Sequence, residues 1–280
     1  MTTTETKSQT ASFEFCESAG RRGTNFLHHK LVAEALKLSL PEPPAPRFTE
    51  AEVRAGFARG EQLFWLPSKD AEGTPITMQG LYGVFDNKAP LGGNLLRSTD
   101  WYEHEPVFTE DTSRVDETEF GSWRLIGAPA IPGTKGENYL RQTVIAAAYV
   151  RDTVYKGEPP SESLRAMLAE PAEREEELAA LVDRDWKKGA EILAGLAFNK
   201  EFRMTPIEAL ISVIVNQHVN KIHVLTGESA WTPCRFRNGN LVLFGNAGEN
   251  GADLDDWPPR RSYDHLGFFL SCSDSVGRES

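Results

Sequence analysis

The character of the amino-acid sequence changes at about Thr226, and this change constrains the fold more than any other feature. Between residues 138 and 223, apolar side chains recur at the spacing of amphipathic helices. After Thr226 that spacing disappears, and short apolar runs alternate with Gly, Asn and Asp. We therefore expect an α+β fold, with several helices in the N-terminal and middle parts and short strands with irregular loops in the C-terminal part.

Helix start and stop signals locate the expected helices. Thr49 followed by Glu52 matches a capping box, and Thr205-Pro206 places proline at a first helical position after a capping residue. Helices are expected over residues 24–38, 49–58, 138–155, 161–171, 173–196 and 205–223.

Strands are expected in two parts of the chain. Between residues 62 and 121, apolar runs such as 63–66 and 81–85 alternate with Gly, Pro and Asp, which predicts short strands or irregular loops. Near the C-terminus, residues 240–244 read as a strand and residues 266–271 as a buried terminal strand. The stretch between these two is polar, turn-rich and long, and long loops inside compact domains are usually functional.

Charge and composition exclude several classes of protein. The chain has 280 residues and a net charge of −11, and an acidic chain disfavours nonspecific binding to nucleic acid. No stretch approaches the length of apolar sequence that a membrane span needs. Residues 1–23 lack the apolar core of a signal peptide and are expected to form a loose N-terminus. Three cysteines without CxxC spacing predict neither a disulfide framework nor a zinc site, which fits a cytoplasmic or virion-associated protein.

The common catalytic and cofactor motifs do not occur. There is no P-loop, no GxGxxG, no HExxH and no GxSxG. Four side chains offer oxygen ligands of the kind that Ca²⁺ prefers, namely Glu249, Asp253, Asp255 and Asp256, but they lack the spacing of a known calcium loop. We expect no cofactor, with calcium as the alternative.

A set of framework residues in the C-terminal part carries a family resemblance. The set is Trp231-Thr232, Arg235, Gly239, Val242, Gly245, Gly251, Pro258, Gly267 and Ser271. This pattern resembles the C-terminal region of the variable proteins that diversity-generating retroelements encode, and residues 205–210 (TPIEAL) resemble the segment that precedes it. Residues 266–271 (LGFFLS) resemble the closing strand of C-type lectin folds of the formylglycine-generating-enzyme type, with Phe269 where that family usually has arginine.

The resemblance implies a single C-type lectin-like domain over residues 24–280, with helical insertions and a diversified ligand-binding region at about 231–272. Buried substitutions in such a scaffold cost about 2–5 kcal/mol, so only side chains outside the core can vary freely. The expected buried framework is Trp231, Val242, Leu266, Phe268 and Leu270.

The expected function is therefore non-enzymatic binding of a macromolecular ligand, a protein, with no nucleic acid as partner. Because Leu241 and Leu243 alternate with Val242, a strand here is expected to turn one face outward, together with Phe236. Arg, Tyr and His side chains nearby are typical anchors of protein interfaces. The candidate ligand-binding residues are Phe236, Arg237, Asn238, Leu241, Leu243, Asn246, Asp255, Arg260, Arg261, Tyr263, Asp264 and His265.

Two other functions are compatible with the sequence. An oxidase related to formylglycine-generating enzymes would, as that resemblance implies, need two neighbouring cysteines, and Cys234 and Cys272 are the candidates in the C-terminal part. The chain could instead be a structural or virion component whose helices mediate assembly.

Overall fold

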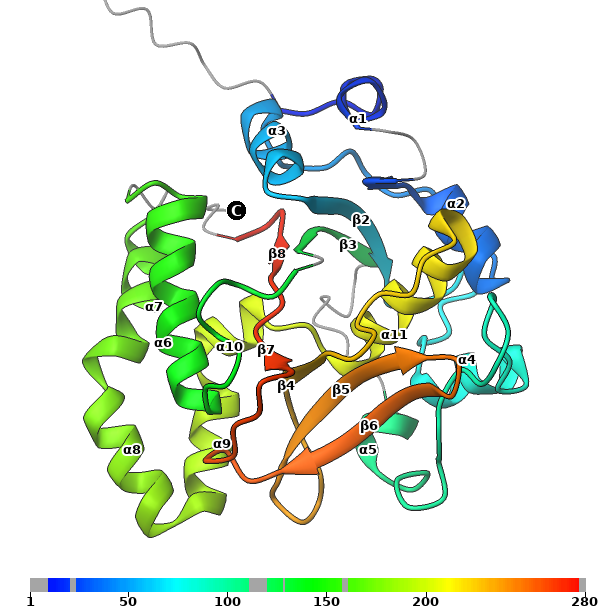
Figure 1. The fold of residues 1–280 in the computed structure, drawn as a ribbon. Coiled ribbons are helices and arrows are strands. Elements are labelled where there is room, and N and C mark those ends of the chain that lie inside the picture. Colours follow the sequence, from blue (N-terminus) through cyan, green and yellow to red (C-terminus); the bar gives the residue numbers. More distant parts are fainter. Residues whose placement is uncertain (1–9, 21–23, 111–119, 128, 158–160, 277–280) are drawn as a thin grey trace, which may run out of the picture.

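The fold is that of an α+β protein with two mixed sheets, here in a computed structural model that describes residues 10–20, 24–110, 120–127, 129–157 and 161–276 (Figure 1). The helices are α1 (Phe13–Ala19), α2 (His29–Leu36), α3 (Glu50–Ala58), α4 (Met78–Phe85), α5 (Pro106–Thr109), α6 (Tyr139–Tyr149), α7 (Glu162–Glu173), α8 (Glu175–Arg184), α9 (Trp186–Gly195), α10 (Ala197–Phe202) and α11 (Pro206–Val215). Two π-helical turns, η1 (Val150–Val154) and η2 (Asn216–Asn220), extend α6 and α11. The strands are β1 (Phe26–Leu27), β2 (Glu61–Pro67), β3 (Gly121–Gly127), β4 (Ser229–Arg235), β5 (Leu241–Gly248), β6 (Gly251–Trp257), β7 (Leu266–Gly267) and β8 (Ser271–Ser273).

The strands form two four-stranded sheets, and each sheet combines strands from different parts of the sequence. The first has the order β1-β2-β3-β8 and the second the order β6-β5-β4-β7. β1 runs parallel to β2 and β7 runs parallel to β4, while the remaining pairs are antiparallel. After β7 the chain crosses from the second sheet to the first, where β8 pairs with β3. The C-terminal residues therefore tie the two sheets together.

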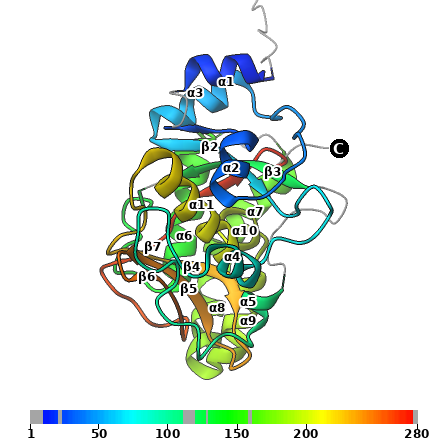
Figure 2. The same cartoon turned by 90° about the vertical axis from the view of Figure 1, so that its right-hand side faces the viewer.

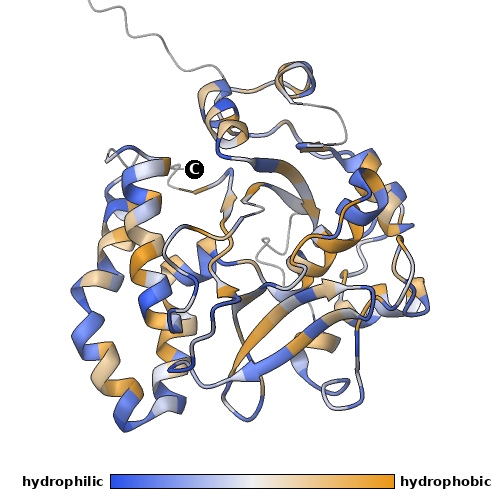
Figure 3. Ribbon diagram, viewed as in Figure 1, coloured by the Kyte–Doolittle hydropathy of each residue, from blue (hydrophilic) through white to orange (hydrophobic). Residues whose placement is uncertain are grey.

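Helix α11 lies between the two sheets (Figures 1 and 2). All of its residues are buried, and its ribbon is largely hydrophobic in Figure 3. A helix that is apolar on every side must be covered on every side, because no face of it gains from contact with water. Its apolar side chains share one core cluster with β2 residues such as Phe64 and β5 residues such as Phe244.

Polar side chains fix both ends of α11 to the first sheet. At the start, Glu208 accepts a hydrogen bond from the Thr205 amide and lies 3.5 Å from the Arg124 guanidinium on β3. At the end, Asn216 and Gln62 exchange two side-chain hydrogen bonds of 2.9 and 3.1 Å. Buried amides and charges need such partners, so these contacts also determine where the helix can sit.

A second buried polar centre surrounds Arg203, which follows α10. Its guanidinium carbon lies 4.0 Å from the ring centre of Tyr139 and 4.3 Å from that of Phe268. Its nitrogens donate to the Asn199 side chain at 2.8 Å, and to the Tyr139 carbonyl and the Thr143 hydroxyl at 3.1 Å each. Among the described residues no carboxylate pairs with it, and burial lowers its pKa to about 10. The group remains charged at neutral pH and joins α6, α10 and the segment between β7 and β8.

The structure confirms the expected capping box at Thr49 and the expected cap at Thr205 with proline at the first helical position, where Thr205 and Glu208 also form a capping box. It also confirms that the expected framework is buried, with exposed fractions of 1% for Trp231, 0% for Val242, 1% for Leu266, 0% for Phe268 and 3% for Leu270. None of the helices that the structure describes has the length and apolar character needed to cross a membrane.

Two expectations in the N-terminal half need correction, one in where a helix begins and one in the type of element. The helix expected at 24–38 begins only at His29, because Phe26 and Leu27 pair with Leu63 and Phe64 as strand β1 and His28 caps the helix. Residues 81–85, expected as strand or loop, lie in α4, where the Thr77 hydroxyl accepts from the Gly80 amide and begins a helix.

The expected loose N-terminus is also wrong for part of its length. Residues 13–19 form α1, capped by Ser12, and Cys16 on this helix is fully buried. Burial of the apolar side of α1 against the first sheet outweighs the polar composition around it. Residues 1–9 and 21–23 of the expected loose segment lie outside the described residues.

Three expectations in the second half need correction. The single helix expected at 173–196 is two helices, because the Asp185 side chain caps α9 and interrupts the chain at that point. The terminal strand expected at 266–271 is divided between β7 and β8 in different sheets. The polar stretch expected as a loop contains β6, a strand whose alternate residues face away from the core.

We expect Arg203→Met to lower the free energy of unfolding by at least about 3 kcal/mol, because three buried acceptors lose a charged donor. Urea denaturation of the full chain measures this. The control is Arg151→Met, which removes an exposed guanidinium that, among the residues the structure describes, pairs with Asp152 alone, and it should change stability by less than about 1 kcal/mol. Equal stability of Arg203→Met and the natural chain would contradict the assigned role.

Candidate binding site

The second sheet has one fully covered face and one partly open face. On the covered face, Val242, Phe244 and Leu254 pack into the core cluster around α11. On the other face, Trp231 and Leu241 are covered by the helices, in a cluster that includes Leu193 on α9 and Leu178 on α8, the helices at the left of Figure 1. The helices do not extend over the rest of this face, and a pocket lies there.

The pocket has a volume of about 280 Å³. It is lined by Gly227, Ser229, Leu243, Asn246, Asp253, Asp255, Trp257, Tyr263, His265 and Leu266. The strand register explains why β5 and β6 both contribute, since Leu243 pairs with Asp255 and side chains of paired residues share a face. Residues widely separated in the sequence thus meet at one surface.

Aromatic rings form one wall of the pocket. The rings of Trp257 and Tyr263 meet edge to face, with centres 4.5 Å apart and an interplanar angle of 86°. The His265 ring lies 5.4 Å beyond Tyr263, and the Arg261 guanidinium lies 5.5 Å from the Trp257 ring centre. Such edge-to-face packing holds large side chains in place at the surface.

Two carboxylates of β6 line the pocket, and they differ in whether a cationic side chain pairs with them. Asp253 lies 3.0 Å from the Arg97 guanidinium and accepts a hydrogen bond from Asn246, also at 3.0 Å. Asp255 accepts from the indole N–H of Trp257 at 2.8 Å, and within the described part of the chain no Lys or Arg pairs with it. Asp255 is exposed, so the pocket presents one negative charge that is not neutralised by a neighbouring cation.

Backbone hydrogen bonds hold the segment from Pro259 to His265 that forms the rim. The Tyr139 amide donates to the Pro259 carbonyl at 3.1 Å, and the Gly136 amide donates to the Tyr263 carbonyl at 3.1 Å. The Ser229 amide donates to the His265 carbonyl at 2.9 Å. Because these contacts use main-chain atoms, the path of the segment does not depend on its exposed side chains.

The structure brings five of the twelve candidate ligand-binding residues together. Leu243, Asn246, Asp255, Tyr263 and His265 line the same pocket. Arg260, Arg261 and Asp264 are exposed on the rim segment without lining the pocket. Arg237 and Asn238 are exposed at the turn between β4 and β5, where the Arg237 amide donates to Glu105 and the Asn238 side chain donates to Asp256.

The outward orientation expected for Phe236, Leu241 and Leu243 is wrong. Their exposed fractions are 4%, 0% and 6%. Leu241 and Leu243 do face away from the α11 core, but both pack in the cluster that the helices form on that face, and Leu243 also lines the pocket. Phe236 lies in the α11 core cluster and packs edge to face with Trp101, with ring centres 5.4 Å apart.

Five lining residues are absent from the candidates chosen by sequence: Gly227, Ser229, Asp253, Trp257 and Leu266, of which Leu266 was expected only as buried framework. Asp253, Asp255 and Trp257 alternate along β6, and this alternation was the available signal for a strand face. Aspartate and glycine are depleted in strands, so the composition favoured a loop.

The structure also locates the groups considered for metal binding and for catalysis. Among the described residues, no three His, Cys, Asp or Glu side chains form a group that could hold a metal ion. Cys234 lies on β4 and Cys272 on β8, in different sheets and against different core clusters. Burial raises the pKa of the Cys272 thiol to about 12, so it is a neutral thiol at pH 7.

Stability measurements should separate buried from exposed candidate residues. We expect Leu241→Ala to lower the free energy of unfolding by about 2–5 kcal/mol, because it opens a cavity beneath the helices. We expect His265→Ala to change it by no more than about 0.5 kcal/mol, because that side chain is exposed. Urea denaturation of both variants measures the difference, and similar losses for the two would contradict the placement of the pocket.

Comparison of the chain with family models, with curated proteins and with solved structures finds no match. The geometry of the pocket is therefore the basis for assigning a function.

Proposed function

We propose that this chain is a non-enzymatic binding protein, a variable protein of a diversity-generating retroelement with a C-type lectin-like scaffold, whose pocket on the second sheet receives a protein ligand. The observation that carries the proposal is the convergence of Leu243, Asn246, Asp255, Tyr263 and His265 at one pocket. The family pattern in residues 231–272 supports the same region independently.

The division between frame and exposed side chains supports a surface that can change its specificity. The framework residues Trp231 and Phe268 are buried, whereas Arg261, Tyr263 and His265 are exposed on a rim held by main-chain hydrogen bonds. Exposed substitutions usually alter stability little, so such positions can vary without loss of the fold. Asn246 is an exception, because its φ of 49° is in the left-handed region that few residues adopt readily.

The pocket chemistry favours a basic side chain of the ligand. Asp255 supplies a negative charge, and the faces of Trp257 and Tyr263 attract cations through their ring quadrupoles. Lysine or arginine offers the complementary charge, and the aromatic wall can contact the apolar stem of either side chain.

A displayed library tests the division between frame and variable surface. Simultaneous randomisation of Asp255, Arg261, Tyr263 and His265 should leave most members folded, as measured by protease resistance on the surface of yeast. The matched control library randomises four buried positions outside the pocket, Trp231, Leu241, Val242 and Phe244, and should lose the fold in most members. The same survival in both libraries, or loss of the fold in both, would contradict the proposal.

Selection from a random peptide array tests the ligand chemistry. Peptides retained by the natural chain should be enriched in Lys and Arg, and Asp255→Asn should remove that enrichment because it removes the charge of the pocket. Asp264→Asn makes the same chemical change at an exposed position outside the lining and should keep it. Retained peptides without basic enrichment would argue against a cationic ligand group.

A further inference from the structure

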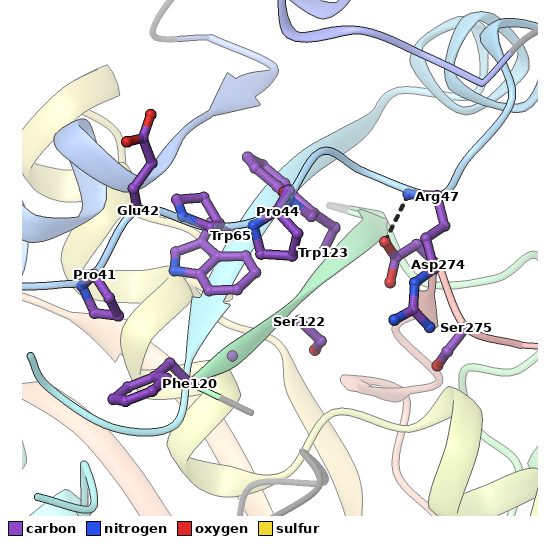
Figure 4. Close-up of a pocket in the computed structure, with 12 residues that line it drawn as sticks. Pro41, Glu42, Pro44, Arg47, Trp65, Phe120, Ser122, Trp123, Asp274 and Ser275 are labelled. Carbon is purple, nitrogen blue, oxygen red and sulfur yellow. Dashed lines mark hydrogen bonds between the residues drawn. The ribbon is translucent and has the colours of Figure 1, made fainter. Parts of the chain in front are cut away.

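A second pocket lies beside the first sheet and shares no lining residue with the binding site (Figure 4). It has a volume of about 200 Å³. The proline-rich segment 41–47 borders one side, the start of β3 borders another, and Asp274 and Ser275 close the far end. The volume is below the roughly 300–1,000 Å³ of pockets for drug-sized ligands, so it suits one or two small rings better than a large cofactor.

The walls of this pocket are mainly aromatic rings and prolines. Trp65 on β2 and Trp123 on β3 are almost fully buried, and their ring centres lie 5.4 Å apart. Phe120 borders the pocket next to Trp65 in Figure 4 and is 40% exposed. Pro41 lies across from Phe120, so the indole of Trp65 is the surface between them.

Trp65 brings an unused hydrogen-bond donor to this pocket. Its Nε1 is buried and, in the described part of the chain, has no hydrogen-bond partner, although Trp65 is only 2% exposed. The nitrogen lies on the side of the indole that faces Pro41 and Phe120 (Figure 4). A buried donor without an acceptor is unfavourable, so a ligand that supplies an acceptor here gains a hydrogen bond that the free protein lacks.

The neighbouring tryptophan shows which acceptor this wall accommodates. The Nε1 of Trp123 donates to the carbonyl of Pro44 at 2.8 Å, within the proline-rich segment of the same chain. Extended proline-rich backbone has no internal hydrogen bonds, so its carbonyls are available as acceptors. Its rings also pack well against aromatic walls, as in the recognition of proline-rich peptides by aromatic grooves.

We propose that this pocket binds a proline residue in an extended segment of a partner protein, with a peptide carbonyl of that segment accepting a hydrogen bond from Trp65 Nε1. The contact would repeat, at Trp65, the arrangement that the chain already makes between Trp123 and Pro44. The proline ring would lie between Pro41 and Phe120.

Titration of the ¹⁵N-labelled full chain with a peptide of six prolines tests the proposal. The indole N–H signal of Trp65, assigned by its loss in Trp65→Phe, should move downfield to saturation as the hydrogen bond forms. The signal of Trp123 should move much less, because its donor is already occupied. A glycine-serine peptide of the same length should leave both signals in place.

The affinity of each variant for a fluorescent form of the same peptide measures how much Trp65 and Phe120 each contribute to binding. Trp65→Phe should weaken binding about fivefold to tenfold, the effect of one lost hydrogen bond. Phe120→Ser should weaken it similarly through lost contact, and this exposed position keeps the test valid if Trp65→Phe does not fold. Trp101→Ser, which removes a 50% exposed aromatic ring outside the pocket, should have no effect.

Three results would overturn the proposal. The first is no response of the Trp65 signal at millimolar peptide. The second is equal weakening of binding by Trp101→Ser and Phe120→Ser, which would indicate nonspecific adhesion to aromatic rings. The third is saturation by N-acetylprolinamide at the same concentration as by the peptide, which would indicate a site for a small molecule.

Discussion

Complete burial of α11 is the constraint on which the rest of the structure depends. A ten-residue helix with no exposed face can exist only if other elements surround it, and the two sheets with α2 and α4 do so. Its polar ends then need internal partners, which Arg124 and Gln62 provide from the first sheet. The position of the helix thereby sets the separation of the two sheets and the side of β5 that is covered.

The helical layer from α6 to α9 determines which part of the second sheet remains open. Arg203 holds α6 to α10 and to Phe268, and α9 packs on β4 from the same side. The helices therefore cover Trp231 and Leu241 but stop short of Asp253 and Asp255. The candidate binding site exists because the layer is narrower than the sheet beneath it.

Local sequence signals predicted the α+β class, the capping box at Thr49, the cap at Thr205, and the buried framework around Val242. They failed where distant contacts decide the structure. Phe26 and Leu27 form a strand only because β2 lies beside them, and Leu241 is buried only because α8 and α9 fold back over it.

Of the candidate site, Tyr263, His265 and Asp255 could be chosen from residue type and from their place in a turn-rich stretch. Asp253 and Trp257 alternate with Asp255 in the sequence, but their place in the pocket depends on the pairing of β5 with β6, which that alternation does not specify.

Pro259, Tyr263 and His265 each attach the rim to neighbouring elements through a main-chain carbonyl oxygen. Every amino acid carries that atom, so these three hydrogen bonds do not depend on which side chains the segment has. Substitutions of the exposed side chains of this segment are therefore compatible with the same main-chain path.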